Sequence, residues 1–161
     1  MDRIQIITTG GTIDKIYFDA KSTYQVGEPA IRDILREANL TIEVDIRPLL
    51  RKDSLEMTDA DRQLIRQAVE ASQERRIVIT HGTDTMVETG CALVGIPDKT
   101  IVLTGAMQPA RFRHTDALFN VASALTAVQT LPPGVYIAMN GRIFDPQTTR
   151  KNVAENRFEE A

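Results

Sequence analysis

Short, apolar, β-branched segments alternate along this chain with longer segments in which apolar residues recur every three or four positions. We expect strands at 4–9, 41–50, 76–80, 100–105 and 134–139. We expect helices between them, at 28–38, 58–72, 84–95 and 116–129. Strands that alternate with helices in this way are typical of a parallel sheet with helices on both faces. The alternation therefore predicts a single α/β domain.

The predicted architecture is a three-layer, doubly wound, mostly parallel sheet of the flavodoxin-like type. In the helix expected at 116–129, Leu118, Val121 and Leu125 recur at helical spacing, and we expect all three to be buried. Residues 10–27 are polar and lack a helical period, so we predict an irregular, mobile loop or lid there.

Three polar, glycine-bearing segments follow the first, third and fourth expected strands. They are TTGGTID at 8–14, THGTDTM at 80–86 and TGAMQPARFRHTD at 104–116. In doubly wound sheets, ligands bind outside the carboxyl ends of the strands, where the strand order reverses. Glycine lets a ligand approach the main chain closely. We therefore expect Thr12, Thr83 and Asp84 to project into one crevice.

Composition and motifs argue against several classes of ligand. The segment TTGGTID does not match G-x-G-x-x-G or the phosphate loop that ends in Lys-Ser/Thr. The net charge is −3, and no basic block or stripe supports nucleic-acid binding. No apolar run approaches the roughly 20 residues of a membrane span, and the N-terminal MDRIQII lacks the apolar core of a signal peptide. We predict a cytoplasmic protein with a small-molecule substrate.

A threonine hydroxyl becomes a nucleophile only when a base removes its proton. His81 and His114 are the two histidines, and we interpret both as structural hydrogen-bonding residues. A lysine can serve as the base if burial lowers its pKa from about 10.4. Lys151 is one candidate. The residues alone do not separate it from the other candidates Lys15, Lys21, Lys52 and Lys99. We interpret Cys91, the single cysteine, as a small buried apolar residue.

Six short motifs together resemble those of the bacterial-type L-asparaginase family. In chain order they are TTGGTID, KSTYQVG, DSLEMTD, THGTDTM, LTGAMQP and NGRIFDPQTTRKN. Each motif alone is moderately specific, whereas six in the right order over essentially the whole chain are very specific. The resemblance implies an amidohydrolase that converts L-asparagine to L-aspartate and ammonia, with no metal and no cofactor.

The resemblance also implies catalytic roles, position by position. Thr12 matches the family's nucleophile, and Tyr24 matches the lid tyrosine that hydrogen-bonds it. Thr83, Asp84 and Lys151 match a second triad, which polarises the substrate or activates water. We expect double displacement through an acyl-enzyme on Thr12. The residues themselves leave Thr83 open as the acylated residue.

Substrate-binding positions follow from the same motifs. Ser54 matches a serine that holds the substrate α-carboxylate, and Asp84 also matches the residue that holds the α-ammonium. Gly11 and Gly82 lie in matching turns, and we expect their backbone amides to face the ligand beside Thr83.

Leu55 departs from the family pattern, because many relatives carry glutamine at this substrate-binding position. Leucine cannot hydrogen-bond a ligand. Asparagine and glutamine differ by one methylene, a difference worth ~1–3 kcal/mol. We therefore predict weak glutaminase activity relative to asparaginase activity, and glutamine at position 55 should raise glutamine turnover.

The chain ends shortly after Lys151, whereas most family members continue into a second, smaller α/β domain. We expect a short-chain asparaginase in which residues 1–161 form the N-terminal catalytic domain alone; a truncated piece of a longer protein is the alternative. The resemblance implies a homo-oligomer, either a dimer or a tetramer. Two other functions stay open, namely a non-catalytic module that senses asparagine or aspartate, and an amidohydrolase acting on glutamine, D-asparagine or an asparaginyl group.

Overall fold

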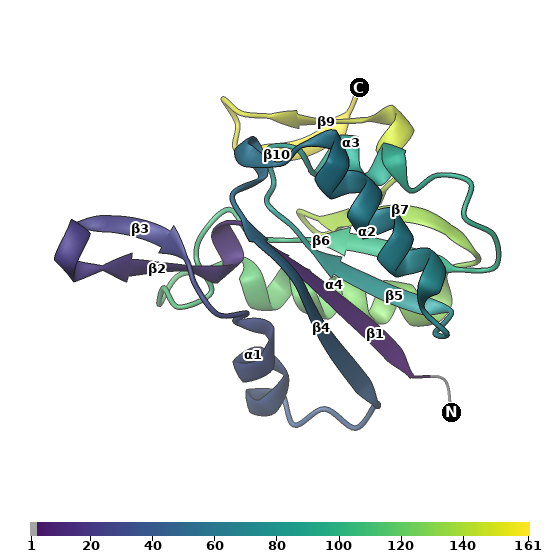
Figure 1. Ribbon diagram of the computed structural model, residues 1–161, viewed down its shortest axis with the longest axis horizontal. Coiled ribbons are helices and arrows are strands. Elements are labelled where there is room, and N and C mark those ends of the chain that lie inside the picture. The colour runs from purple at the N-terminus through teal and green to yellow at the C-terminus, as the bar shows by residue number, and fades with distance from the viewer. Residues whose placement is uncertain (1–2) are drawn as a thin grey trace.

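The computed structural model describes residues 3–161. They form a six-stranded sheet with helices on both faces and two separate two-stranded hairpins (Figure 1). The strands of this sheet are β1 Ile4–Gly10, β4 Val44–Lys52, β5 Arg76–Thr80, β6 Thr100–Thr104, β7 Gly134–Met139 and β8 Arg142–Phe144. Their spatial order is β4-β1-β5-β6-β7-β8. All neighbours pair in parallel except β8, which runs antiparallel to β7. The five parallel strands have the flavodoxin-like order, so the predicted fold class is confirmed.

Four α-helices within residues 3–161 cover the sheet. They are α1 Ile31–Glu37, α2 Asp59–Ala71, α3 Met86–Ala92 and α4 Ala117–Thr130. Helices α1 and α4 share one hydrophobic core with a face of the sheet, whereas α2 and α3 share a second core with the other face. Every residue of β1 is buried. Burial on both faces explains why the central strands β5 and β6 are nearly continuous apolar runs, whereas the edge strand β4 alternates between half-buried and exposed residues.

The expected helices and strands are present, with shifts at their ends. The helix expected at 58–72 begins one residue later because Thr58 is its N-cap. The Thr58 hydroxyl accepts a hydrogen bond from the Asp61 amide at 3.2 Å, and the Asp61 carboxylate accepts one from the Thr58 amide at 2.9 Å. This reciprocal capping box defines where α2 starts.

The predicted irregular loop at 10–27 is wrong over most of its length. Strands β2 Lys15–Phe18 and β3 Thr23–Val26 pair antiparallel into a hairpin that projects from the body of the protein (Figure 1). The segment lacks a helical period, but its isoleucine, tyrosines and phenylalanine are residues that favour strands. The turn between the two strands holds Ser22 in the left-handed region, at φ 49°.

Two buried positions expected from the sequence lie on the surface instead. Leu118 is 50% exposed, although Val121 and Leu125 are buried as predicted. The phase of α4 turns Ala117 and Ala124 toward the sheet, which leaves Leu118 on the outer side of the helix. Cys91 is also exposed, because it lies on the outer side of α3.

A second hairpin, which we did not predict from the sequence, follows β8. It consists of β9 Thr149–Asn152 and β10 Arg157–Glu160. Phe158 on β10 is buried in the core on the α2–α3 face, where its ring lies 6.5 Å from that of Phe144. This apolar anchor holds β9, and therefore Lys151, against the body of the domain.

Candidate active site

The turns that follow β1 and β5 touch through two glycines. Gly11 has φ +88°, and a Cβ atom placed on it would lie 2.4 Å from the backbone nitrogen of Gly82. Both the backbone angle and the lack of space therefore require glycine. Thr12 and Thr83 are the next residues in the two turns, so this backbone contact makes their positions neighbours. The sheet order reverses between β1 and β5, which is where a ligand site is expected.

A third segment docks onto the same place. Ser54 begins the short 3₁₀ turn η3 Ser54–Glu56, and a Cβ atom on Gly82 would lie 2.6 Å from the Ser54 hydroxyl oxygen. The Thr85 hydroxyl donates to the Ser54 carbonyl at 2.8 Å, and the Thr85 amide donates to the Ser54 hydroxyl at 3.3 Å. Ser54 is buried by these contacts.

Lys151 joins Thr83 and Asp84 in one polar cluster. Its Nζ donates to the Thr83 hydroxyl at 2.8 Å and to the Asp84 carboxylate at 2.7 Å. Thr83 is buried, the Lys151 side chain is 14% exposed, and the Asp84 side chain is 39% exposed. The lysine thus contacts a buried hydroxyl and a half-open carboxylate together. Such a cluster can polarise a carbonyl or transfer a proton at the hydroxyl.

Tyr24 and Thr12 lie on separate elements, and no hydrogen bond joins their side chains within residues 3–161. Thr12 is half-buried at the start of the 3₁₀ turn η1 Thr12–Asp14, whereas Tyr24 lies on the projecting hairpin and is 52% exposed. The Tyr24 ring lies 5.4 Å from that of Tyr17 and 5.8 Å from that of Phe112. Neither the Thr12 nor the Tyr24 hydroxyl makes a hydrogen bond within residues 3–161. Their expected pairing stays a prediction.

The backbone amides of Gly11 and Gly82 differ in whether they are free to bind a ligand. The Gly11 N–H donates to the Lys52 carbonyl at 2.9 Å, so the expectation that it faces a ligand is wrong. The bond forms because β4 runs beside β1 up to this turn. Across the described chain no acceptor contacts the Gly82 N–H, which leaves it free for a ligand.

Leu55 is 74% exposed, so its side chain points away from the protein interior.

His81 is a buried structural group next to the site. Its Nδ1 lies 2.6 Å from the Gly82 carbonyl oxygen, and its Nε2 lies 2.7 Å from the Thr89 hydroxyl. Burial lowers the pKa of His81 from 6.5 to about 4, although the hydrogen bond to the Gly82 carbonyl acts in the opposite direction. The ring therefore stays neutral, in agreement with its interpretation as a structural residue. His114 is exposed.

Asp14 is a buried carboxyl that the sequence reasoning missed. Its side chain accepts a hydrogen bond from the Ala30 amide at 2.9 Å, and its carbonyl accepts one from the Gly27 amide at 2.8 Å. Burial raises the pKa of Asp14 to about 6, against the Ala30 hydrogen bond and the charges of Arg111 and Arg51. Asp14 closes the base of the β2–β3 hairpin. The signal available in the sequence was an aspartate three residues after a glycine pair.

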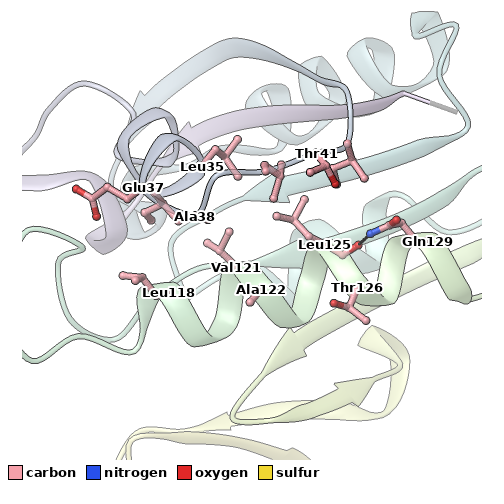
Figure 2. A pocket seen from close by; sticks show the side chains of 13 residues that line it. Leu35, Glu37, Ala38, Thr41, Leu118, Val121, Ala122, Leu125, Thr126 and Gln129 are labelled. Atoms are coloured by element: carbon pink, nitrogen blue, oxygen red, sulfur yellow. Dashed lines mark hydrogen bonds between the residues drawn. The ribbon is translucent and has the colours of Figure 1, made fainter. Parts of the chain in front are cut away.

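A cavity of about 600 Å³ lies away from the turns that follow β1 and β5. It opens between α1 and α4, where Leu35, Val121 and Leu125 line it (Figure 2). Its walls are mostly apolar and include none of the expected catalytic residues. The part of the chain that the structure describes holds no group of three or more His, Cys, Asp or Glu side chains suited to a metal ion. It also holds no helix long and apolar enough to cross a membrane.

The fold and the candidate site together define an α/β protein in which Thr12, Thr83 and Asp84 follow the two strands, β1 and β5, between which the strand order reverses. Comparison with known proteins identifies the family. The family model described as "Asparaginase, N-terminal" matches residues 3–159. The chain therefore belongs to the bacterial-type asparaginase family, and it corresponds to the family's N-terminal domain.

Individual relatives agree with this assignment. An L-asparaginase of Thermococcus kodakarensis is 35% identical over 88% of this chain and 45% of its own length. A subunit of the glutamyl-tRNA(Gln) amidotransferase of Methanococcus vannielii is 29% identical over 90% of this chain and 36% of its own. The solved structure of the Thermococcus kodakarensis L-asparaginase superimposes with a TM-score of 0.86 at 30% identity, over 98% of this chain and 51% of that one. The chain thus spans about half the length of such relatives, or less.

Proposed function

We propose that this chain is an amidohydrolase that converts L-asparagine to L-aspartate and ammonia. The observation that carries the proposal is the contact of Lys151 with both Thr83 and Asp84, at 2.8 and 2.7 Å. This cluster lies beside the turn of Thr12, a second hydroxyl suited to attack a carbonyl. The L-asparaginase named among the relatives supports asparagine as the substrate.

In the first half of the proposed reaction, the Thr12 hydroxyl attacks the side-chain carboxamide carbon. A C–O bond forms, the hydroxyl proton passes to the leaving nitrogen, and the C–N bond breaks to release ammonia. Tyr24 assists this proton transfer once the β2–β3 hairpin moves over the site. The free N–H of Gly82 stabilises the oxyanion, a contribution of about 3 kcal/mol for one well-placed donor.

In the second half, water attacks the acyl-enzyme carbonyl. The new C–O bond forms as the ester bond to Thr12 breaks, and a water proton returns to the Thr12 oxygen. Thr83 and Lys151 polarise the carbonyl or orient this water, while Asp84 neutralises the lysine and holds the substrate α-ammonium. The Ser54 hydroxyl accepts a hydrogen bond from Thr85, so its own proton is left to donate to the α-carboxylate.

Ammonia release from L-asparagine tests the proposal directly. We expect the parent protein to release ammonia, and Thr12→Ala to lose at least a hundredfold in kcat. Hydroxylamine should replace water and release the acyl group as a hydroxamate, and, without hydroxylamine, mass spectrometry of rapidly acid-quenched enzyme should find the acyl group on Thr12. Acylation of Thr83 would reverse the two threonine roles, and no ammonia from the parent would overturn the proposal.

A larger carboxamide is the second candidate substrate. Leu55, the neighbour of Ser54, is 74% exposed, and the β2–β3 hairpin projects from the body of the protein (Figure 1), so we infer that a larger substrate has room at this side of the site. One relative is named as part of a glutamyl-tRNA(Gln) amidotransferase. Assays on asparaginyl peptides would separate this candidate from free asparagine. A non-catalytic sensor has less support, because binding alone does not require the lysine–threonine contact.

The weak glutaminase activity, the cytoplasmic location and the homo-oligomer all stay predictions. Apolar surface is available for self-association, since Leu118 and Phe119 on α4 are 50% and 62% exposed. Sedimentation of the purified chain would measure its oligomeric state.

A further inference from the structure

The carboxylate of Asp53 connects two parts of the protein, the turn η3 and the β2–β3 hairpin. One of its oxygens accepts a hydrogen bond from the Leu55 amide at 3.1 Å, which caps the turn η3 that carries Ser54. Its other oxygen lies 2.9 Å from the Nζ of Lys15, the first residue of the β2–β3 hairpin. A single carboxylate thus contacts both the serine turn and the hairpin.

The serine turn is also held from its other side. The backbone and side chain of Ser54 are fastened to Thr85, and the Ser54 side chain packs directly on Gly82. These contacts join η3 to the loop that carries Thr83. Any force that the hairpin exerts on Asp53 is therefore transmitted to a turn in contact with the proposed catalytic centre.

The hairpin has few other polar ties to the rest of the protein. Within residues 3–161, the Lys15–Asp53 pair is the only hydrogen bond or ion pair that joins a side chain of residues 15–26 to the rest of the chain. A hollow of about 360 Å³ separates the two parts, with Tyr24 and Gln25 on the hairpin side and Glu56 on the turn side. The ion pair crosses this hollow, because Lys15 and Asp53 both line it.

We propose that Lys15 and Asp53 are positioning residues whose ion pair ties the hairpin to the Ser54 turn and keeps that turn ready to bind the substrate α-carboxylate. The inference rests on the proposed function for its kinetic consequence, but the tie itself does not depend on it. Neither side chain touches the reacting atoms; both act through Ser54.

The electrostatics around Asp53 support a persistent pair. Burial acts to raise the pKa of Asp53, but hydrogen bonds from Lys15 and the Leu55 amide and the charges of Lys15 and Lys151 lower it below 3.8. Asp53 is therefore ionised at neutral pH.

Steady-state kinetics and hydrogen exchange test the proposal together. Lys15→Met should raise the KM for L-asparagine about three- to fivefold, the size expected for a partly exposed ion pair, and leave kcat within twofold. Lys15→Arg should restore the parent KM. Asp53→Asn keeps the acceptor for Leu55 but removes the charge, so combining it with Lys15→Met should add no further loss.

Hydrogen exchange at the Leu55 amide provides a readout that does not depend on catalysis. We expect this amide to exchange several-fold faster in Lys15→Met than in the parent, although the substitution is on the hairpin. Lys21→Met is the matched control, because Lys21 lies on the same hairpin, above the Phe18 ring at 5.8 Å. It should leave both KM and the Leu55 exchange rate unchanged.

An unchanged Leu55 exchange rate in Lys15→Met would overturn the inference, and so would a loss in kcat at constant KM. If the parent releases no ammonia from asparagine, the proposed function fails. The exchange measurement then decides alone whether the hairpin is tied to the turn.

Discussion

Two buried titratable groups, His81 and Asp14, should affect stability in opposite directions with pH. His81 has its pKa lowered from 6.5 to about 4, and Asp14 has its pKa raised from 3.8 to about 6. The pH range between the unfolded and folded pKa values of His81 nearly coincides with the corresponding range for Asp14. We predict that the contributions of these groups cancel between about pH 4 and pH 6, and that removing either group reveals the other.

For His81, the unfolded chain binds a proton below about pH 6.5, whereas the folded protein does not bind one until about pH 4. Its contribution to stability is therefore complete above pH 6.5 and is lost as the pH falls toward 4. One proton of difference gives a slope of up to about 1.4 kcal/mol per pH unit, or about 3 kcal/mol over the interval.

For Asp14, the folded protein keeps a proton up to about pH 6, whereas the unfolded chain releases it above about pH 4. Its contribution is therefore complete below pH 3.8 and is lost as the pH rises through 6. The limiting slope of the free energy of unfolding against pH has the same size as for His81 and the opposite sign. Over the range between the two pKa values of Asp14 it again corresponds to about 3 kcal/mol.

Urea unfolding between pH 4.5 and pH 5.5 measures both effects. The chain has no tryptophan, so far-ultraviolet circular dichroism is the appropriate signal. Relative to the parent, His81→Gln should become less stable with rising pH, by about 1 kcal/mol over this unit, because Asp14 then acts alone. Asp14→Asn keeps the acceptor for the Ala30 amide, and its stability should rise with pH by a similar amount.

The exposed residues His114 and Asp19 supply matched controls. His114→Gln and Asp19→Asn should follow the parent's pH dependence. If His81→Gln and Asp14→Asn also show the parent's slope, then neither buried group has the displaced pKa on which the reasoning depends. Slopes of the same sign in both variants would refute the cancellation.

Three further predictions concern the site. Lys151→Met should lower kcat for asparagine at least a hundredfold while the fold is retained, which steady-state kinetics and circular dichroism would measure; a loss below tenfold would contradict its role. Leu55→Gln should raise kcat/KM for glutamine relative to asparagine, and an unchanged ratio would show that position 55 does not contact the ligand. Gly11→Ala should lower the free energy of unfolding by at least about 2 kcal/mol, because the new Cβ meets the Gly82 backbone and the residue has a positive φ; urea unfolding at the parent's stability would contradict this.

The sequence by itself determined the architecture of this protein, since the periods of apolar residues are local properties of strands and helices. The alternation predicted the parallel sheet and placed the threonine-rich turns at one edge of it. The motifs identified the family. Local patterns were less informative where several choices satisfy the same period. The hairpin at 15–26 lacks a helical period but is not irregular, and Leu118 is exposed although its spacing fits the buried face of α4.

Only the tertiary structure decided which polar groups meet. The contact of Gly11 with Gly82 depends on β1 and β5 being neighbours, and the approach of Lys151 to Thr83 depends on a C-terminal hairpin anchored by Phe158. Lys15, Lys21, Lys52 and Lys99 carry the same functional group as Lys151, and no local pattern separates them. Residues far apart in the chain come together through strand order and core packing, and these are properties of the folded whole.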